Sequence, residues 1–221
     1  IRDLAHGETV LVVGLGRFGS SLACELAEAG VEVLGIDTDE EIVQEHSGLL
    51  THVVRADATK LELLRQLSVE EFRFAVVAIG THLESSILVA SQLLRLGVES
   101  IWAKAISDAH GQILDQLGVH HVVYPEHEMG RRVAHLLSGS VSDYVDLGTG
   151  FAMVTATVPP AVVGHRLDES DILRRHGVQI VARRAGEGDW EHTNGATVPS
   201  WDDVVVALGP EDALHRFGDL T

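Results

Sequence analysis

The sequence has little cysteine, little lysine and few aromatic residues. Cys24 is the only cysteine among 221 residues, Lys60 and Lys104 are the only lysines, and Phe, Trp and Tyr together make up 5%. One cysteine forms no disulfide within the chain, and it excludes a cysteine-based zinc site. This cysteine usage fits a reducing compartment.

Long apolar runs and an excess of basic residues are also missing. No apolar run approaches the roughly 18 residues of a membrane-spanning helix, and no basic-then-apolar leader opens the chain. Asp and Glu number 33 against 16 Lys and Arg, so the net charge is −17. This acidic balance argues against nucleic acid and anionic membrane surfaces as partners. The chain begins at Ile1 rather than at Met, which leaves open whether a membrane segment precedes it in the gene.

Apolar strand-like runs alternate with helical patterns through the first 138 residues. We expect strands at 9–13, 31–36, 52–55, 74–79, 100–105 and 121–123, and helices at 17–29, 39–46, 84–96, 108–117 and 126–137. Thr59 is a candidate cap for a further helix. Repeated units of this kind predict an α/β fold with a Rossmann-like, doubly wound parallel sheet.

The pattern changes after Gly139. Short strands are expected at 144–147, 153–158, 179–183 and 204–207, short helices at 171–175 and 212–217, and a loop at 186–200. This pattern predicts a small α+β lobe. We therefore expect two domains, 1–138 and 139–221, with the helix at 126–137 as a hinge between them.

The expected helix at 84–96 is apolar around most of its circumference. Such a helix is buried on more than one side. Either it is a core helix of the first domain, or its outer face lies in an oligomer interface.

The sharpest motif is Gly14-Leu15-Gly16-Arg17-Phe18-Gly19, which follows a strand and opens a helix. In that context the first glycine permits a tight turn, the second lets a phosphate approach the backbone, and the third lets helix and strand pack closely. The helix N-terminus supplies free N–H groups to the phosphate. Asp37 ends the next strand, where a carboxylate accepts ribose hydroxyls and repels a 2′-phosphate. The spacing predicts an adenine nucleotide other than NADP.

Arg17 adds a guanidinium to this loop, which suits a ligand with more anionic charge than a dinucleotide, such as ADP or ATP. The alternative is a solvated arginine near a helix start. Neither Tyr124 nor Tyr144 is followed four positions later by lysine, so a Tyr-x-x-x-Lys hydride-transfer pair is absent. A Rossmann domain without such a pair suggests a sensor.

With these residues in view, the chain resembles the cytosolic regulator of K⁺ conductance (RCK) subunits of the Ktr and Trk potassium uptake systems, of the KtrA-like type. The matching stretches are GLGRFGSSLA at 14–23, GIDTDEEIVQ at 35–44, THVVRADAT at 51–59, VVAIG at 76–80, IWAKA at 101–105, VVYPEHEMGRRVAHLL at 122–137, VGHRL at 163–167 and HGVQIVARR at 176–184. The similarity covers nearly the whole chain.

The resemblance implies a regulator rather than an enzyme, which binds ATP or ADP, and in some members NAD(H), in its first domain. It implies homodimers that assemble into an octameric ring. The ring would be cytoplasmic and peripheral to the inner face of the membrane, docked on a potassium-translocating subunit of the KtrB or TrkH type. Nucleotide exchange in this family changes the ring and gates the pore.

The resemblance also implies site residues. The family's nucleotide site matches Gly14, Gly16, Arg17, Phe18 and Gly19 in the phosphate loop, Asp37 and Thr38 at the ribose, Asp57 and Ala58 at the adenine, Ala78, Ile79 and Gly80 after the fourth strand, and Lys104 near the phosphates. Arg131, in the helix at 126–137, is expected to add a charge contact.

Glu126 matches an acid that helps hold Mg²⁺ or Ca²⁺ between two triphosphates in family dimers. A hard cation with oxygen ligands makes this role physically reasonable. The competing explanation is that Glu126, just after Pro125, is a helix N-terminal acid that favours the helix dipole.

The sequence offers two further candidate sites. Some family members bind cyclic di-AMP through a segment that aligns with Arg174–Gln179, but His176 and Gln179 replace the family's aromatic and Asn, which weighs against this ligand. Thirteen histidines are present, and His120, His121 and His127 lie near two glutamates, but their spacing does not complete a zinc set. The alternatives to a nucleotide-sensing regulator are an NAD-dependent oxidoreductase or redox sensor, and the detached cytosolic domain of a single-chain potassium channel.

Overall fold

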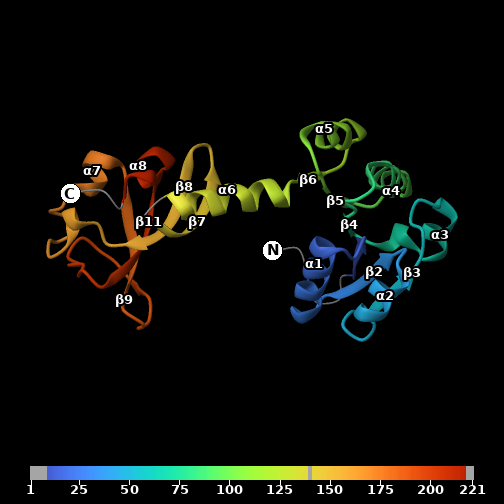
Figure 1. The fold of residues 1–221 in the computed structure, drawn as a ribbon, viewed down its shortest axis with the longest axis horizontal. Coiled ribbons are helices and arrows are strands. Elements are labelled where there is room, and N and C mark those ends of the chain that lie inside the picture. The colour runs from blue at the N-terminus through green and yellow to red at the C-terminus, as the bar shows by residue number, and fades with distance from the viewer. Residues whose placement is uncertain (1–8, 139–140, 218–221) are drawn as a thin grey trace. The chain divides into compact units, whose positions relative to one another are not determined.

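The computed structural model describes residues 9–138 and 141–217. Contacts divide the chain after Glu126 into two compact units, each drawn in Figure 1. From His127 onward, helix α6 (Pro125–Ser138) belongs with the second unit. The domain boundary after Ser138 remains a prediction.

The first unit contains a six-stranded parallel sheet with the order β3-β2-β1-β4-β5-β6. Its strands are β1 (Thr9–Val13), β2 (Glu32–Asp37), β3 (His52–Arg55), β4 (Phe74–Val77), β5 (Ser100–Lys104) and β6 (His121–Val123). The helices between them are α1 (Arg17–Glu28), α2 (Glu40–His46), α3 (Leu61–Gln66), α4 (Leu83–Leu96) and α5 (Asp108–Leu117), with a 3-10 turn at Val69–Glu71. The strand order reverses between β1 and β4, and ligands of such sheets bind beyond the carboxyl ends of the strands at this point.

Two hydrophobic cores cover the two faces of this sheet. Leu11 and Val13 of β1 pack with α3, α4 and α5 residues such as Leu93. Val10 and Val12, whose side chains alternate to the other face, pack with Ala23 of α1 and its neighbours. The expected doubly wound fold is confirmed.

Helix α4 is buried on one side only. Val89, Ala90 and Leu93 are fully buried, whereas Leu83 and Leu88 are 39% and 41% exposed. The buried face makes α4 a core helix of the first unit, and an interface on its outer face remains a prediction.

The second unit contains an antiparallel sheet with the order β10-β9-β11-β8-β7. Its strands are β7 (Val141–Gly148), β8 (Phe151–Thr157), β9 (Gln179–Ala185), β10 (Glu191–His192) and β11 (Asp203–Pro210), joined by α7 (Ile172–His176), α8 (Glu211–His215) and a 3-10 turn at Pro160–Val162. One core includes Tyr144, Val154, Ile180, Val205 and Leu214. The small α+β lobe is thus confirmed, but the stretch at 186–200 is not all loop, because β10 pairs there with β9.

Within the described part of the chain, no helix is both long and apolar enough to span a bilayer.

Candidate functional site

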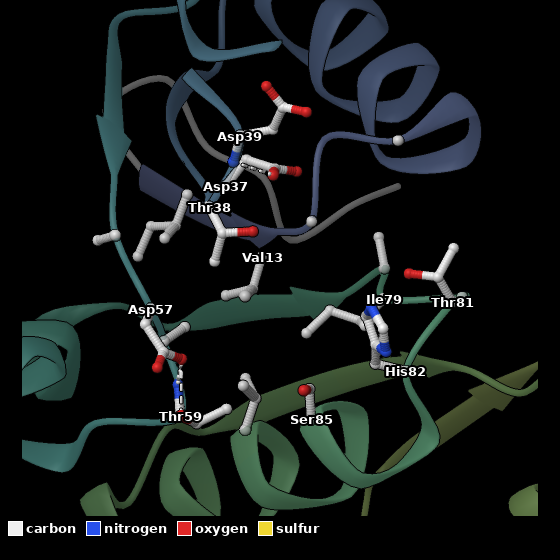
Figure 2. Close-up of a pocket in the computed structure, with 18 of the residues that line it drawn as sticks. Val13, Asp37, Thr38, Asp39, Asp57, Thr59, Ile79, Thr81, His82 and Ser85 are labelled. Atoms are coloured by element: carbon white, nitrogen blue, oxygen red, sulfur yellow. Dashed lines mark hydrogen bonds between the residues drawn. The ribbon is translucent and has the colours of Figure 1, made fainter. Parts of the chain in front are cut away.

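A cavity of about 340 Å³ lies at the carboxyl ends of the parallel strands in the first unit. Figure 2 shows it between the ends of β1, β2 and β3 on one side and the start of α4 on the other. It is lined by Val13, Gly14, Gly16, Ile36, Asp37, Thr38, Asp39, Ile42, Ala56, Asp57, Ala58, Thr59, Ala78, Ile79, Gly80, Thr81, His82, Ser85 and Val89. Nine of the predicted nucleotide-site residues are in this lining: Gly14, Gly16, Asp37, Thr38, Asp57, Ala58, Ala78, Ile79 and Gly80.

The structure requires glycine at two of the three loop positions, Gly14 and Gly19, but not at Gly16. Gly14 has φ +92°, a backbone conformation that side chains disfavour. A Cβ on Gly19 would lie 1.9 Å from the Gly14 carbonyl oxygen, so only glycine lets α1 pass this close to the loop. A Cβ on Gly16 would meet no atom within 4 Å. The fold itself therefore does not require glycine at position 16, whereas the close approach of a ligand would.

Asp37 connects the loop to the end of β2. Its Oδ2 accepts a hydrogen bond from the Leu15 N–H at 2.7 Å, and its Oδ1 accepts one from the Asp39 N–H at 3.0 Å. Each carboxylate oxygen can accept more than one hydrogen bond. The carboxylate is thereby held in place by the backbone and keeps capacity for ribose hydroxyls.

Asp57 is held in a similar way after β3. Its Oδ1 accepts hydrogen bonds from the Thr59 hydroxyl at 2.6 Å and the Thr59 N–H at 3.0 Å. The hydroxyl bond is the main reason that the pKa of Asp57 is lowered. The expectation that Thr59 caps the next helix is wrong: Lys60 is the N-cap residue of α3 and makes no side-chain cap hydrogen bond, because the Thr59 hydroxyl is used by Asp57.

The opposite wall was not found from the sequence. Thr81, His82 and Ser85 line the cavity from the loop after β4 and the first turn of α4. The first N–H groups of a helix have no intrahelical partners, and no side chain caps the start of α4, so these N–H groups are available to a ligand. The sequence pointed to these three residues only through their position after the fourth strand, next to the place where the strand order reverses.

A charged cluster lies beside the glycine loop. The Lys104 ammonium donates to Glu126 Oε1 at 2.5 Å, and it lies 5.8 Å from the centre of the Phe18 ring. A Cβ on Gly80 would be 3.2 Å from the Lys104 Nζ, so the ammonium borders a residue that lines the cavity. The hydrogen bond from Lys104 lowers the pKa of Glu126, and the positive charge of Arg17 adds to this shift.

These groups differ in exposure. The Lys104 side chain is only 10% exposed, whereas Glu126 is 66% exposed. Arg17 is exposed and makes no salt bridge within the described residues. Negative charge thus lies at the side of the cavity formed by Asp37 and Asp57. Positive charge, from Arg17 and Lys104, lies beside the glycine loop.

Other predicted residues lie elsewhere. Arg131 belongs to the second unit, where its guanidinium pairs with Asp146 at 3.1 Å. In the segment matched to a cyclic di-AMP site, Arg174 pairs with Asp171 at 2.6 Å. Both roles remain predictions.

The three histidines considered for zinc do not form a cluster with acids in the described part of the chain. The His120 Nδ1 accepts a hydrogen bond from the Ile101 N–H, and the His121 ring stacks on Trp102 at 4.1 Å. His127 is exposed in the second unit.

The family assignment rests on sequence comparison. The TrkA-N domain family matches residues 10–125. The Ktr system potassium uptake protein C of Bacillus subtilis (strain 168) is 35% identical over 207 residues, which cover 93% of this chain and 94% of the relative. The chain belongs to the TrkA-N family. The Ktr system potassium uptake protein A of Vibrio alginolyticus is also similar to this TrkA-N chain, at 31% identity over 204 residues that cover 92% and 93% of the two chains.

Solved structures share the fold of this TrkA-N chain. The GsuK RCK domain matches with a TM-score of 0.66 at 16% identity, covering all of this chain and 49% of that chain. The GsuK channel bound to NAD matches with a TM-score of 0.66 at 18% identity, covering 98% and 40%. The family match and the Ktr relatives confirm the resemblance to the Ktr type of subunit, and the GsuK match confirms the RCK fold. At these identities the structural likeness concerns the fold alone, and the chain spans half or less of both solved chains.

Proposed function

We propose that this chain is a nucleotide-sensing regulatory subunit of a potassium uptake system and that its ligand is ATP or ADP. The supporting observation is the arrangement of charge along one cavity. Carboxylates at Asp37 and Asp57 suit ribose hydroxyls and the adenine amino group, while the α1 N-terminus, Arg17 and Lys104 suit phosphates.

NAD(H) is the alternative ligand, and the NAD in the GsuK channel structure supports it. It shares the ADP moiety with ATP, so the same carboxylates serve both. The N–H groups at the start of α1 already serve the pyrophosphate of a dinucleotide. The additional positive charges of Arg17 and Lys104 therefore favour the nucleotide with the longer and more anionic phosphate chain.

Glu126 is the proposed cation ligand. A carboxylate near a triphosphate is repulsive unless a divalent cation lies between them, and Mg²⁺ and Ca²⁺ both prefer oxygen ligands. In the structure Lys104 neutralises this carboxylate. A bound phosphate competes for Lys104 and leaves Glu126 available to the cation.

The proposed regulation follows from differential binding. ATP and ADP shift the shape of the assembly only if they bind two shapes with different affinity. The proposed assembly is a homodimer within an octameric ring, docked at the cytoplasmic face on a membrane potassium-translocating subunit. The names of the Ktr relatives support the potassium uptake system in this proposal. A non-enzymatic role is part of this proposal, and NADH oxidation is the competing activity.

Calorimetric titration of the purified chain with ATP, ADP and NADH, with and without Mg²⁺, tests the proposal. We expect ATP and ADP to bind, and only ATP to depend strongly on the cation. Arg17→Glu should weaken ATP by about tenfold or more, since hydrogen bonds to charged groups contribute about 1.5–3 kcal/mol, and it should weaken ADP less.

Arg95→Glu is the matched control, because it makes the same charge change on an exposed residue at the far end of α4. Equal weakening of ATP and ADP by Arg17→Glu would remove Arg17 from the terminal-phosphate site. Exclusive NADH binding without cation dependence, or turnover of NADH, would replace the proposed function by a redox one.

A further inference from the structure

A second polar cluster lies in the C-terminal unit, apart from the nucleotide cavity. It consists of His135 on α6 and Glu211 and His215 on α8, whose ligand atoms lie within 4.8 Å of one another. Glu211 and His215 are four residues apart and therefore share one face of α8. His135 approaches that face from a segment more than 70 residues earlier in the chain.

The distances suit a tetrahedral metal ion. The His135 Nε2 lies 3.5 Å from Glu211 Oε1. Two nitrogen or oxygen ligands at 2.0–2.2 Å from a tetrahedral zinc ion are about 3.4 Å apart. The His135 and His215 rings have centroids 4.6 Å apart and are tilted by 38°. Small side-chain rotations would bring the third ligand to the same distance.

Tyr144 holds two of the three side chains in position. Its hydroxyl donates to Glu211 Oε1 at 3.0 Å, and its ring stacks on His135 with centroids 3.9 Å apart. Metal-ligating carboxylates are usually oriented by such a hydrogen bond.

The charge and exposure of the cluster also fit. The nearby Arg131 guanidinium is paired with Asp146, so its charge is offset. The His135 side chain is only 11% exposed and Glu211 39%, while His215 is exposed. The cluster is thus open to solvent on the His215 side, which leaves room for an ion to enter and for a water ligand.

We propose that His135, Glu211 and His215 bind one transition-metal ion of the Zn²⁺ class, with water in the fourth position. Two imidazoles and one carboxylate form a ligand set typical of zinc sites that keep an open position. Imidazole nitrogen favours Zn²⁺ and its transition-metal neighbours over Mg²⁺ and Ca²⁺. The site differs in chemistry from the oxygen-ligand site proposed at Glu126. A bound ion would tie α6 to α8.

Titration of the full chain with Co²⁺ and Zn²⁺, without nucleotide, tests the site. We expect one Co²⁺ ion to give visible absorption bands of tetrahedral or five-coordinate geometry, Zn²⁺ to displace it, and excess Mg²⁺ not to do so. Zn²⁺ should also raise the midpoint of thermal unfolding, since a ligand of the native state stabilises it.

Two variants locate the ion. His215→Ala removes an exposed ligand at little cost to folding, and it should weaken Zn²⁺ by at least about tenfold and abolish the thermal shift. Tyr144→Phe leaves all three ligands and should weaken Zn²⁺ by roughly 10- to 100-fold through lost orientation. His192→Ala changes another exposed histidine of the same unit and should leave binding unchanged.

The proposal is overturned if the wild-type chain gives no saturable Co²⁺ spectrum. It is also overturned if His215→Ala binds Zn²⁺ as tightly as His192→Ala, because the ion would then bind elsewhere.

Discussion

The two units place their polar side chains differently. In the first unit, carboxylates and cations follow successive parallel strands and collect at one edge of the sheet, and the backbone itself holds Asp37. In the second unit, His135, Tyr144, Glu211 and His215 hold one another across two helices and a strand. The direction of the parallel strands gathers the first group. The second is gathered by tertiary packing, which brings His135 and Tyr144 to the face of α8 that Glu211 and His215 share.

This difference bears on how each cluster responds to a ligand. The first cluster surrounds a cavity and contains the exposed Arg17 and the ion pair between Lys104 and Glu126, so these charged groups are available to bind a polyphosphate. In the second cluster the ligand atoms lie within 4.8 Å of one another, a spacing that suits a single ion. We therefore expect the first cluster to bind a nucleotide and the second, as proposed, to bind a metal ion.

The largest expected effect is a substitution that destabilises the first unit and leaves the second folded. Gly19→Val would place side-chain atoms against the Gly14 carbonyl oxygen and the Ala78 side chain. Overpacking costs about 1–3 kcal/mol, and a backbone clash at this distance should reach the upper end. Hydrogen exchange read by mass spectrometry should show lost protection in the first unit and retained protection in the second.

Gly16→Ala is the control for this substitution. Its methyl group meets open space, so the cost to folding should be below about 1 kcal/mol, while nucleotide affinity falls. Equal protection in Gly19→Val and Gly16→Ala would show that α1 can move away from the loop, contrary to the packing described.

The same difference explains what could be predicted from the sequence. The glycine loop and Asp37 lie within 24 residues of each other, and their roles follow from a strand-loop-helix-strand pattern that is local. Nearly all strands and helices were recognised in the same way. The short β10 was missed because its two residues show no periodicity, and it exists only through pairing with β9.

Long-range contacts could not be predicted. No sequence pattern joins His135 to His215, and the histidines that lay close together in the sequence, His120 and His121, turned out to accept a backbone hydrogen bond and to stack on Trp102. Likewise, the pairing of Lys104 with Glu126 depends on β5 and the start of α6 meeting at the sheet edge. Resemblance to a family pointed to these two residues, but not to their contact.

The next largest effect concerns the ion pair between Lys104 and Glu126 in the first cluster. Glu126→Gln removes the carboxylate that repels a triphosphate and that is proposed to hold a cation. ATP affinity without Mg²⁺ should then stay equal or rise, while the gain from adding Mg²⁺ should fall by about tenfold, the range of a lost charged contact. Calorimetry at matched ionic strength measures both values.

Glu128→Gln serves as the control, since it neutralises an exposed acid on the same helix. An unchanged response to Mg²⁺ in Glu126→Gln would leave Glu126 as a helix N-terminal acid paired with Lys104.

A smaller effect is expected in the second cluster. Tyr144→Phe deletes the hydroxyl that donates to Glu211. Because the Glu211 side chain is 39% exposed, water screens this bond and we expect it to contribute about 1 kcal/mol, less than a buried bond to a charged group. With a chelator present to remove bound metal, hydrogen exchange should show lower protection in the second unit only. Tyr124→Phe, in the first unit, provides the comparison. If Tyr144→Phe lowered protection equally in both units, the two clusters would not be independent.

The smallest effect is a pH dependence confined to the first unit. His110 is fully buried, and its Nδ1 accepts a hydrogen bond from the Ile106 N–H at 3.3 Å. The proton of the neutral ring is therefore on Nε2, which has no hydrogen-bond partner among the described residues. Burial lowers the pKa of His110 below its ordinary value of 6.5, because the charged form would lose its hydration.

The sign of the effect follows from proton binding. Below pH 6.5 the unfolded chain binds a proton at His110 that the folded chain does not, so the stabilising contribution is complete above that pH and is lost as the pH falls. Hydrogen exchange at pH 5.5 and 7.5, corrected for the intrinsic rate, should therefore show weaker protection of α5 at the lower pH. His110→Leu should reduce this difference in protection between the two pH values. His52→Gln, at an exposed histidine of β3, is the control and should retain it. If His110→Leu keeps the full difference, the pH dependence arises from another group.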